Sequence, residues 1–569
     1  MANTTKCIEP GGNGTAEHNV SRRRLLQGGA GLAAAGLLGL PAVEHVAAQD
    51  ATPQEGGTLT FSVSQITSNS HMLHLRHYAG SENIYTRLMA NERLVTLNPE
   101  RTEYVGAVAE SFTFSESGDQ LTFTLREGLT WHDGEPFTAA DVDFTYHMIC
   151  IPGVGPTLFG SSFNETIVGI QDYIDGKTDR IEGLTVDDDH TVTFQLFEGL
   201  NETSVLSLFN QICIAPDHVL NQYLDRENGA AILESEWATT SAHIGLGPFR
   251  VIEYVADQYI RYEPFENYYK GKPLLGELIY RPFADATTNA AALQNQEVDV
   301  ARLPVAEYGR FQEFDFLTFN EAKSPSYSGT PFNARQPFLT KEVRQALMHA
   351  IDRDAMAEVL YANAVEVVHT PIEFPGIPES PNLKKYEYDP EKAKSLLESA
   401  GWDPSRVIRW AVGQVPSNEE TLAYYAAING YWSEVGVQAE FQVFGQDSTV
   451  LWGPDWDFDL YPSAYPIGLP QAVALHYDPR RASYVSSGFD SPEFVELWDQ
   501  SYLELPEDEM IAAIHGLQEF MAEEALGLMI VRSPDIWGIN NRVHGLTPNY
   551  FPYEYDLYDW EWEKVWVEQ

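Results

Sequence analysis

The sequence predicts a mixed α/β protein with more than one domain, and three observations indicate this fold class. The chain has 569 residues, which is more than one hydrophobic core usually holds. Its hydrophobic fraction of 44% and aromatic fraction of 12% are those of a globular protein. Segments with strand-like alternation of apolar residues occur along the same chain as segments with apolar residues at helical spacing.

Three short segments have the alternation that is typical of β-strands. Residues 58–63 (TLTFSV) are rich in β-branched and aromatic residues and open the folded part of the chain. Residues 120–126 (QLTFTLR) follow a Ser-Gly-Asp turn, which predicts the second half of a β-hairpin. Residues 191–196 (TVTFQL) repeat this design after a run of aspartates. We therefore expect antiparallel strands in this region.

Three segments predict helices. Residues 341–360 (KEVRQALMHAIDRDAMAEVL) place their apolar side chains on one helical face. In residues 389–401, Asp389 suits an N-cap and Gly401 suits the position just past the helix end. Residues 506–525 predict a third helix, which a buried strand at 526–531 (LGLMIV) follows directly.

The charge of the chain is strongly negative. It carries 83 Asp and Glu against 35 Lys and Arg, a formal net charge of −48. Such a field repels nucleic acid and anionic membrane surfaces, which argues against non-specific binding to polyanions. The acids are spread along the chain, which favours a solvated surface suited to a salty medium. A dedicated cation-binding surface is the alternative.

The first 48 residues predict an export signal. Ser21 and three arginines precede two leucines and the run GGAGLAAAGLLGL, an apolar stretch of about 13 residues that is too short to span a membrane. This arrangement resembles a twin-arginine signal, with a Sec signal as the alternative. Residues 49–57 predict a short linker. We therefore expect an exported protein, in the periplasm or at the outer face of the cell membrane.

The cysteines are few. Cys7 lies in the leader, so Cys150 and Cys213 are the two cysteines of the mature chain. Outside the cytoplasm they are candidates for one disulfide, although the sequence does not show whether they are close enough. Two cysteines without a Cys-x-x-Cys pattern argue against a structural zinc site, and we expect no cofactor.

The segment WHDGEPFTAADV raises the question of catalysis, because His132 and Asp133 stand side by side. Asp133-Gly134 is a turn dipeptide, and Thr138 with Asp141 predicts a capping box at the start of a helix. A catalytic dyad also needs a nucleophile, and the chain contains no Gly-x-Ser-x-Gly. We therefore interpret the segment as structural, with a secreted hydrolase as the alternative of another class.

The same segment begins a series of motifs that resembles the family 5 extracytoplasmic solute-binding proteins, the dipeptide-, oligopeptide- and nickel-binding receptors of ABC importers. The series runs in order over roughly residues 56–555. It comprises LTFTLREGLTWHDGEPFTAADVDFTY, IGLGPF with Leu246 where the family has threonine, NYYKGKP, ALQ with EVDV, VRQAL with AIDRD, and DPEKAKSLLESAGW.

The resemblance implies a two-lobed periplasmic-binding-protein fold of type II, in its large form with an extra subdomain, and with two crossovers between the lobes. It places lobe I at residues 58–325, with the extra subdomain at about 98–238. Lobe II is expected at 326–530, and residues 531–569 return to lobe I. A Ser/Pro/Gly-rich stretch near residues 323–329 and Ser533-Pro534 are the expected crossovers.

The resemblance also implies a solute site between the lobes. The family pairs a peptide amino terminus with an Asp in a Gly-Trp-x-x-Asp stretch, but here Ala464-Tyr465 stands there without that Asp. This departure speaks against a free α-amino group as ligand and favours a stacking wall of Tyr461 and Tyr465. Tyr327 and Asn333, at the crossover, are further ligand-binding candidates.

A second group of candidates follows the first strand. Arg76, His77 and Tyr78 are expected at the cleft, and the fork of Arg76 suits a carboxylate. His71, His74 and His77 are spaced by three residues and form a weaker alternative as a metal or metal-chelate site. The chain has no nucleotide-binding G-x-x-x-x-G-K-[ST] loop.

Taken together, the residues and the resemblance predict a monomeric receptor, not an enzyme. It would capture a peptide or another small organic solute and deliver it to the permease subunits of an ABC transporter. A nickel or metal-chelate receptor is the alternative.

Overall fold

The computed structural model places Pro53–Gln569 in one compact unit. It describes residues 52–63, 89–98 and 103–569, apart from the segments 152–153, 155–162, 256–257, 324–325, 373–376, 413–414, 416–418, 445–456, 467–476, 478–487 and 547–560 and the positions 165, 211, 228, 284, 362, 462, 504 and 533.

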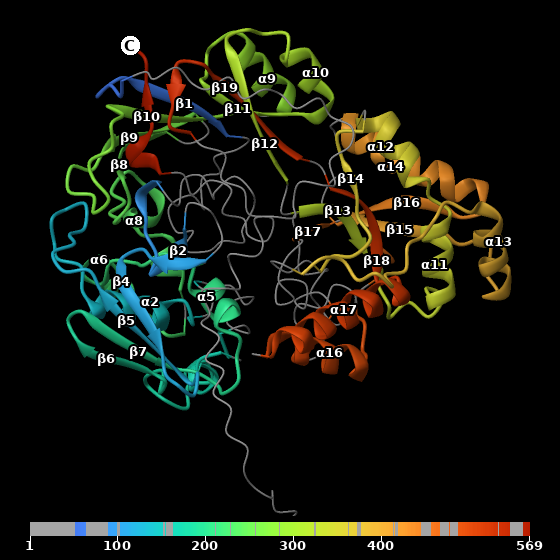
Figure 1. Cartoon of the computed structure of the whole chain (residues 1–569), viewed down its shortest axis with the longest axis horizontal. Coiled ribbons are helices and arrows are strands. Elements are labelled where there is room, and N and C mark those ends of the chain that lie inside the picture. Colours follow the sequence, from blue (N-terminus) through green and yellow to red (C-terminus); the bar gives the residue numbers. More distant parts are fainter. Residues whose placement is uncertain are drawn as a thin grey trace, which may run out of the picture. The chain divides into compact units, whose positions relative to one another are not determined.

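A seven-stranded mixed sheet forms the first part of the fold (Figure 1). Its central strand β1 pairs in parallel with β10 and β11, whereas the remaining pairs are antiparallel. The strand order is β12 (Leu317–Lys323), β19 (Pro534–Asn540), β11 (Val300–Leu303), β1 (Thr58–Val63), β10 (Glu277–Pro282), β9 (Tyr259–Pro264) and β8 (Phe249–Val255).

The C-terminal part of the chain completes this sheet. Strand β19 lies between β11 and β12, and Arg542 follows it. The Arg542 guanidinium donates to both oxygens of Asp299 at 2.7 Å and to the Thr58 carbonyl oxygen at 2.9 Å. Asp299 in turn accepts from the Thr60 amide. One ion pair therefore links the first strand, β11 and the returning segment.

A second, antiparallel sheet lies within residues 109–195. Its order is β4 (Ala109–Phe114), β5 (Gln120–Leu125), β7 (Thr191–Gln195) and β6 (Leu184–Asp188), which confirms the predicted hairpin and strands. Phe209 packs against Phe194, with ring centroids 4.8 Å apart, and against Phe123 at 5.2 Å. This sheet and most of the first one share a hydrophobic cluster, the first core.

Short elements surround these two sheets. They are β2 (Val95–Leu97) paired with β3 (Tyr104–Gly106), β20 (Val543–His544) paired with β21 (Trp566–Val567), α2 (Ala139–Met148), α4 (Ile170–Ile174), α5 (Glu202–Asn210), α6 (Asp217–Leu220), η3 (Asn221–Tyr223), α7 (Ala230–Leu233), α8 (Glu236–Thr239), α9 (Ala286–Gln294), η4 (Val305–Glu307), α10 (Tyr308–Phe311) and η6 (Trp562–Lys564).

Residues between 326 and 532 form separate sheets with a separate hydrophobic cluster, the second core. One sheet has the order β14 (Glu366–Val367), β18 (Gly527–Arg532), β13 (Ser326–Pro331) and β17 (Ser463–Pro466). The other is the parallel pair β15 (Val407–Val412) and β16 (Gln438–Val443). The helices here are α11 (Lys341–His349), α12 (Arg353–Tyr361), α13 (Pro390–Ser399), α14 (Glu419–Glu434), α16 (Pro492–Tyr502) and α17 (Glu507–Glu524).

The chain passes between the two groups of sheets at the two predicted crossovers. Strand β12 ends at Lys323 in the first sheet, and β13 begins at Ser326 in the other group. Strand β18 ends at Arg532, and β19 begins at Pro534 back in the first sheet. Pairs of consecutive strands of this kind are suited to act as hinges between two lobes.

The prediction of one helix over residues 341–360 was wrong at its centre. The chain forms α11 and α12 instead, separated by Ala350 to Asp352. The Asp352 carboxylate accepts from the Ala355 amide at 2.9 Å, so this aspartate starts a new helix where the apolar stripe alone indicated continuation. The caps of α13 are as predicted, because Asp389 accepts from the Lys392 amide and Gly401 has φ = +70°.

Arg353, the first residue of α12, fastens three segments of the second core. Its buried guanidinium donates to the carbonyl oxygens of Val368 at 2.8 Å, Met529 at 3.0 Å and Tyr386 at 2.6 Å. Burial lowers the pKa of this side chain to about 10. The side chain still satisfies backbone carbonyls that would otherwise be costly to bury.

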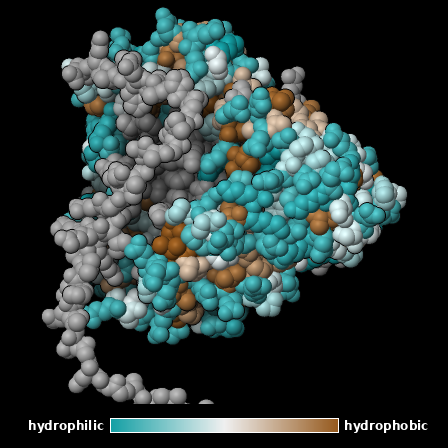
Figure 2. All heavy atoms as spheres, turned by 45° about the vertical axis from the view of Figure 1, so that its right-hand side comes forward, coloured by the Kyte–Doolittle hydropathy of each residue, from teal (hydrophilic) through white to brown (hydrophobic). Residues whose placement is uncertain are grey.

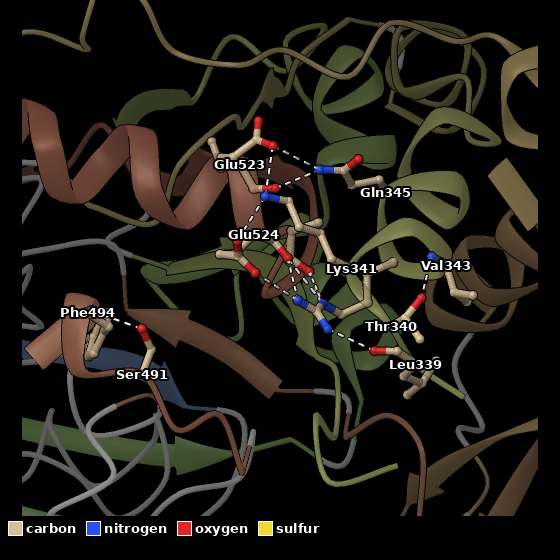
Figure 3. A network of polar contacts seen from close by, with 12 residues as sticks. Leu339, Thr340, Lys341, Val343, Gln345, Ser491, Phe494, Glu523 and Glu524 are labelled. Carbon is tan, nitrogen blue, oxygen red and sulfur yellow. Dashed lines mark hydrogen bonds and ion pairs between the residues drawn. The ribbon is translucent and has the colours of Figure 1, made fainter. Parts of the chain in front are cut away.

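A polar network closes the end of α17 (Figure 3). Arg344 donates to the carbonyl oxygens of Glu524 and Ala525, which have no partner within the helix. Lys341 and Gln345 point toward Glu523, and Lys341 also pairs with Glu524 at 2.9 Å. The two acids lie at the unfavourable negative end of the helix dipole, and the cations Lys341 and Arg344 offset that cost.

The surface agrees with the acidic composition. Figure 2 shows a face on which hydrophilic residues dominate and apolar residues occur in small groups. Within the described part of the chain, no helix is both long and apolar enough to cross a membrane.

The disulfide that the sequence left open is not formed. Cys150 and Cys213 are both buried, and neither forms a disulfide. The Cys150 thiol donates to the Tyr146 carbonyl oxygen at 3.2 Å, and burial raises its pKa to about 12. Cys213 lies in an extended segment that bridges to Arg93. Each thiol is held within the first core, and the high pKa makes Cys150 unreactive.

Replacing Arg353 with Met should destabilise the protein by about 3 kcal/mol, because three buried carbonyls lose their donor. Urea unfolding followed by tryptophan fluorescence measures this loss. Arg310→Met is the control, since Arg310 forms an exposed i,i+3 pair with Glu307 and should change stability by about 0.5 kcal/mol or less. Equal losses for the two variants would contradict this role of Arg353.

Added salt should stabilise the protein, because screening reduces the self-repulsion of 48 excess negative charges. We expect the melting temperature to rise by about 5 °C or more between about 0.05 M and about 1 M NaCl, with KCl equally effective. Saturation at millimolar Ca²⁺ or Mg²⁺, with no further effect of NaCl, would instead support the dedicated cation-binding surface.

Candidate functional site

His132 connects two of the sequence motifs. Its Nε2 donates to the Gly247 carbonyl oxygen at 3.0 Å, and its Nδ1 accepts from the Gly245 amide at 3.2 Å. The ring is therefore held as the neutral tautomer with its proton on Nε2. Burial lowers the pKa of His132 to about 4. The turn at residues 245–247 packs closely on residues 89–91, since a Cβ on Gly247 would lie 2.6 Å from backbone atoms there.

Asp133 does not orient His132. Its Oδ1 accepts from the Glu135 amide at 3.2 Å, and its Oδ2 pairs with His218 Nε2 at 2.9 Å. Thr138 and Asp141 form the predicted capping box of α2. Both ring nitrogens of His132 are bonded to backbone, so neither can take a proton from a nucleophile without breaking a structural hydrogen bond. The structural interpretation of this segment is confirmed.

Strand β17 is an edge strand next to the first crossover. It pairs antiparallel with β13 and has no second partner strand within the described residues. The register sets Tyr465 opposite Tyr327, so two of the predicted ligand-binding positions lie at one place on this pair. An edge strand offers unpaired backbone N–H and C=O groups to an extended ligand.

A tightly held loop, residues 457–461, leads into β17. Asn333 Nδ2 and Gln336 Nε2 both donate to the Phe458 carbonyl oxygen, at 2.7 Å and 3.0 Å. The Asn333 amide donates to the Asp459 carbonyl oxygen at 2.9 Å, and Asn333 Oδ1 accepts from the Arg335 amide. Asn333 is completely buried, so its side chain positions the loop.

Arg409 holds the same loop from the other side. On β15, it donates to both oxygens of the buried Asp459 through Nε at 3.2 Å and Nη2 at 3.0 Å, and to Asp457 through Nη1 at 2.6 Å. The Arg409 amide also donates to Asp459 at 2.9 Å. Both carboxylates of the loop are therefore ion-paired within the protein, and Asp459 is closed to a ligand ammonium group.

Tyr461 packs beside this loop. Its half-buried ring lies against Phe458, with centroids 6.5 Å apart, in a small cluster with Phe444 and Ala411. Burial raises the pKa of the Tyr461 hydroxyl. The cluster forms where the parallel strands β15 and β16 end, which is the edge where α/β sheets commonly bind ligands.

The sequence of these elements matches a known family model. Residues 103–478, about two thirds of the chain, match the bacterial extracellular solute-binding proteins, family 5.

The chain belongs to this family.

Known proteins agree with this membership. A putative ABC transporter peptide-binding protein of Brucella ovis is 32% identical over 315 residues, which cover 55% of each protein. The matched region therefore spans about half the length of that relative. The oligopeptide-binding protein AppA of Bacillus subtilis, solved with a nonapeptide, superposes with a TM-score of 0.75 at 22% identity over 91% of this chain and 100% of AppA. NikZ of Campylobacter jejuni, solved with Ni(L-His), gives 0.70 at 18% identity over 90% and 99%.

Family membership and the structural matches confirm the predicted fold class. The chain has the two-lobed α/β fold of the family 5 receptors, and the two crossovers connect the lobes.

Some predicted positions lie outside the described residues. These are Arg76, His77, Tyr78, His71 and His74, which all fall within residues 64–88. Among the residues that the structure does describe, no group of three or more His, Cys, Asp or Glu could hold a metal ion.

Sequence reasoning missed the residues that hold the loop. Gln336 and Arg409 lie about 70 positions apart, and neither belongs to a motif. The alternation of charge in residues 457–459 (Asp-Phe-Asp) was a signal that a cation should lie nearby, but it could not identify which one.

Stability should fall as the pH drops from about 6.5 to about 4. The unfolded chain protonates His132 near pH 6.5, whereas the folded protein keeps it neutral down to about pH 4, so acid favours the unfolded state. The hydrogen bond to the Gly247 carbonyl oxygen and the Asp133 charge raise the pKa of His132 and so oppose this shift, whereas Arg250 lowers it further. His132→Gln should remove up to about 3 kcal/mol of the acid-induced loss measured by urea unfolding. The control His515→Gln, on the side of α17, should keep the wild-type dependence of unfolding free energy on pH. If His132→Gln also kept it, His132 would not be the cause of the acid-induced loss.

Proposed function

We propose that the protein is an exported receptor of an ABC importer that captures peptides or peptide-like solutes between its two lobes. It delivers the solute unaltered to membrane permease subunits and acts as a monomer. Lobe I comprises residues 58–325, with the extra subdomain at about 98–238, and lobe II comprises 326–530, with the return at 531–569. The leader of residues 1–48, of the twin-arginine type, and the linker 49–57 fit a receptor at the outer face of the membrane.

The observation that carries this proposal is the edge of strand β17. It lies in lobe II, is continuous with the firmly held loop at 457–461, and pairs with the crossover strand β13. Backbone groups at a sheet edge bind any extended peptide, because they recognise the main chain and not the side chains. The AppA structure with a nonapeptide supports a peptide as the class of solute.

The charges near β17 favour a ligand without a free amino terminus at this position. Arg409 forms ion pairs with Asp457 and Asp459. Ala464-Tyr465 stands where the family has the stretch whose Asp pairs with a peptide amino terminus. A buried ammonium group without a carboxylate partner would be unfavourable by several kcal/mol. Blocked, cyclic or internally bound peptides, with apolar or aromatic groups against Tyr461 and Tyr465, avoid this cost.

A metal-chelate receptor is the second candidate. It is favoured by the spacing of His71, His74 and His77 and by the NikZ structure with Ni(L-His). A secreted hydrolase is disfavoured, because both ring nitrogens of His132 are hydrogen-bonded to the backbone of Gly245 and Gly247. Asp133 pairs with His218 and not with His132. The protein is therefore expected to bind its solute without chemical change.

Binding assays should separate these functions. We expect tri- to hexapeptides to raise the melting temperature through mass action. N-acetylated forms should bind at least about tenfold more tightly than free forms, because acetylation removes the ammonium charge that lacks a carboxylate partner. N-methylation of alternate backbone amides should weaken binding at least about tenfold, since each methyl removes a hydrogen bond. Mass spectrometry should recover the peptides intact.

Three other outcomes would contradict the function proposed above. Loss of binding on acetylation would mean that an ammonium group is recognised. A shift with Ni²⁺-histidine and none with peptides would support the metal-chelate receptor. Cleavage of the peptide would show an enzyme.

A further inference from the structure

One side chain joins the two hydrophobic cores. Leu200 packs against both the first core and the second core, and no other residue in the described part of the chain does so. Its backbone forms an isolated antiparallel bridge with Leu503, 303 positions away. A Cβ built on Gly199 would lie 3.8 Å from Leu503 Cδ2, so the Leu503 side chain lies against this glycine. The contact is small, and its side chains are the apolar ones of Leu200 and Leu503.

Two helices flank the contact in sequence, α5 after Leu200 and α16 before Leu503; both helices are labelled in Figure 1. Leu200 is followed by Asn201, whose Oδ1 accepts from the Ser204 amide at 3.0 Å and fixes the start of α5. Leu503 immediately follows α16, and its amide donates to the Gln500 carbonyl oxygen. Gly199 has φ = +79°, which lets the chain turn out of the extra subdomain toward Leu503. The contact therefore moves with α5 on one side and with α16 on the other.

The position of this contact differs from that of the other contact between cores. Val305 joins the second core to a smaller cluster of lobe I, but it directly follows β11, a neighbour of the crossover strand β19. A contact beside a hinge moves little when the lobes rotate. Leu200 follows β7, in a sheet that contains no crossover strand, so rotation about the crossovers must separate it from Leu503.

We propose that Gly199, Leu200 and Leu503 form a latch that engages when the two lobes close. The inference rests on the proposed function, because the latch would retain a solute held between the lobes. Its single bridge is strong enough to bias the closed state and weak enough to open without unfolding either core. The latch acts on solute release more than on capture, since it forms only after the lobes meet.

Cysteine cross-linking tests the latch directly. Partners in an antiparallel bridge have Cα atoms about 4.5–5.5 Å apart, which suits a disulfide. In a Cys7→Ser background, the pair Leu200→Cys and Leu503→Cys should oxidise at least about tenfold faster than the control pair Leu200→Cys and Leu422→Cys. Leu422 matches Leu503 in exposure, 39% against 38%, but lies on α14. Oxidised glutathione takes up the two electrons and two protons of the thiols, and the native thiols are buried.

The oxidised protein should then be locked. A peptide bound before oxidation should dissociate at least about tenfold more slowly than from the reduced protein, and dithiothreitol should restore the rate. Without solute, small-angle scattering should show a smaller radius of gyration in the oxidised form. Cross-linking no faster than in the control pair, or equal radii in the two forms, would overturn the latch. If no peptide binds at all, the proposed function fails, whereas cross-linking and scattering still decide the latch.

Truncation provides an independent measurement. Leu200→Ala and Leu503→Ala should each increase the dissociation rate by about tenfold and leave the association rate within about twofold. The double variant should be no faster than the single variants, because both remove the same contact. Leu422→Ala should change neither rate. Additive effects of the two latch substitutions, with circular dichroism showing all variants folded, would contradict a shared contact.

Discussion

The architecture depends on the insertion of β19 between β11 and β12. This insertion makes the last part of the chain a structural member of the first lobe, and the ion pair of Arg542 with Asp299 fixes it to β1. Lobe I therefore cannot complete its sheet until lobe II has been synthesised. It also follows that two strand connections, and not one, join the lobes, which restricts their relative motion to rotation about that pair of crossovers.

The same constraint organises the candidate site. Strand β13 leaves the first crossover and carries β17 as its edge neighbour, so the candidate site lies beside that crossover. Asn333, Gln336 and Arg409 hold the loop before β17 from two sides. If the proposed site is correct, this order lowers the entropic cost of binding, because the loop is held in place before a solute arrives. Arg409 also sets the electrostatics of the loop, since it pairs with Asp457 and closes the buried Asp459 to other cations.

Local patterns predicted local structure well. The strand at 58–63, the hairpin before residue 120, the capping box of Thr138 and the caps of α13 all follow from side chains near in sequence. The break between α11 and α12 was missed because the apolar stripe continues across it, and Asp352 competes with that stripe by capping α12. Of the residues at the site, Asn333 was named as a ligand contact, its hold on the loop was not foreseen, and Arg409 was not named. Their partners lie 50 to 125 positions away, a distance over which one sequence carries no pairing signal.

The latch and the hinge have complementary tasks, and their chemistry differs accordingly. The crossovers are continuous segments of the chain between paired strands, so they connect the lobes whether these are open or closed. A bridge between two leucines has no charge and few hydrogen bonds to satisfy, so it can break and reform without leaving a buried polar group unpaired. An ion pair in its place would respond strongly to salt, which is a disadvantage for a protein of net charge −48 whose surface electrostatics must vary with ionic strength. An apolar contact makes closure depend on the solute and not on the medium.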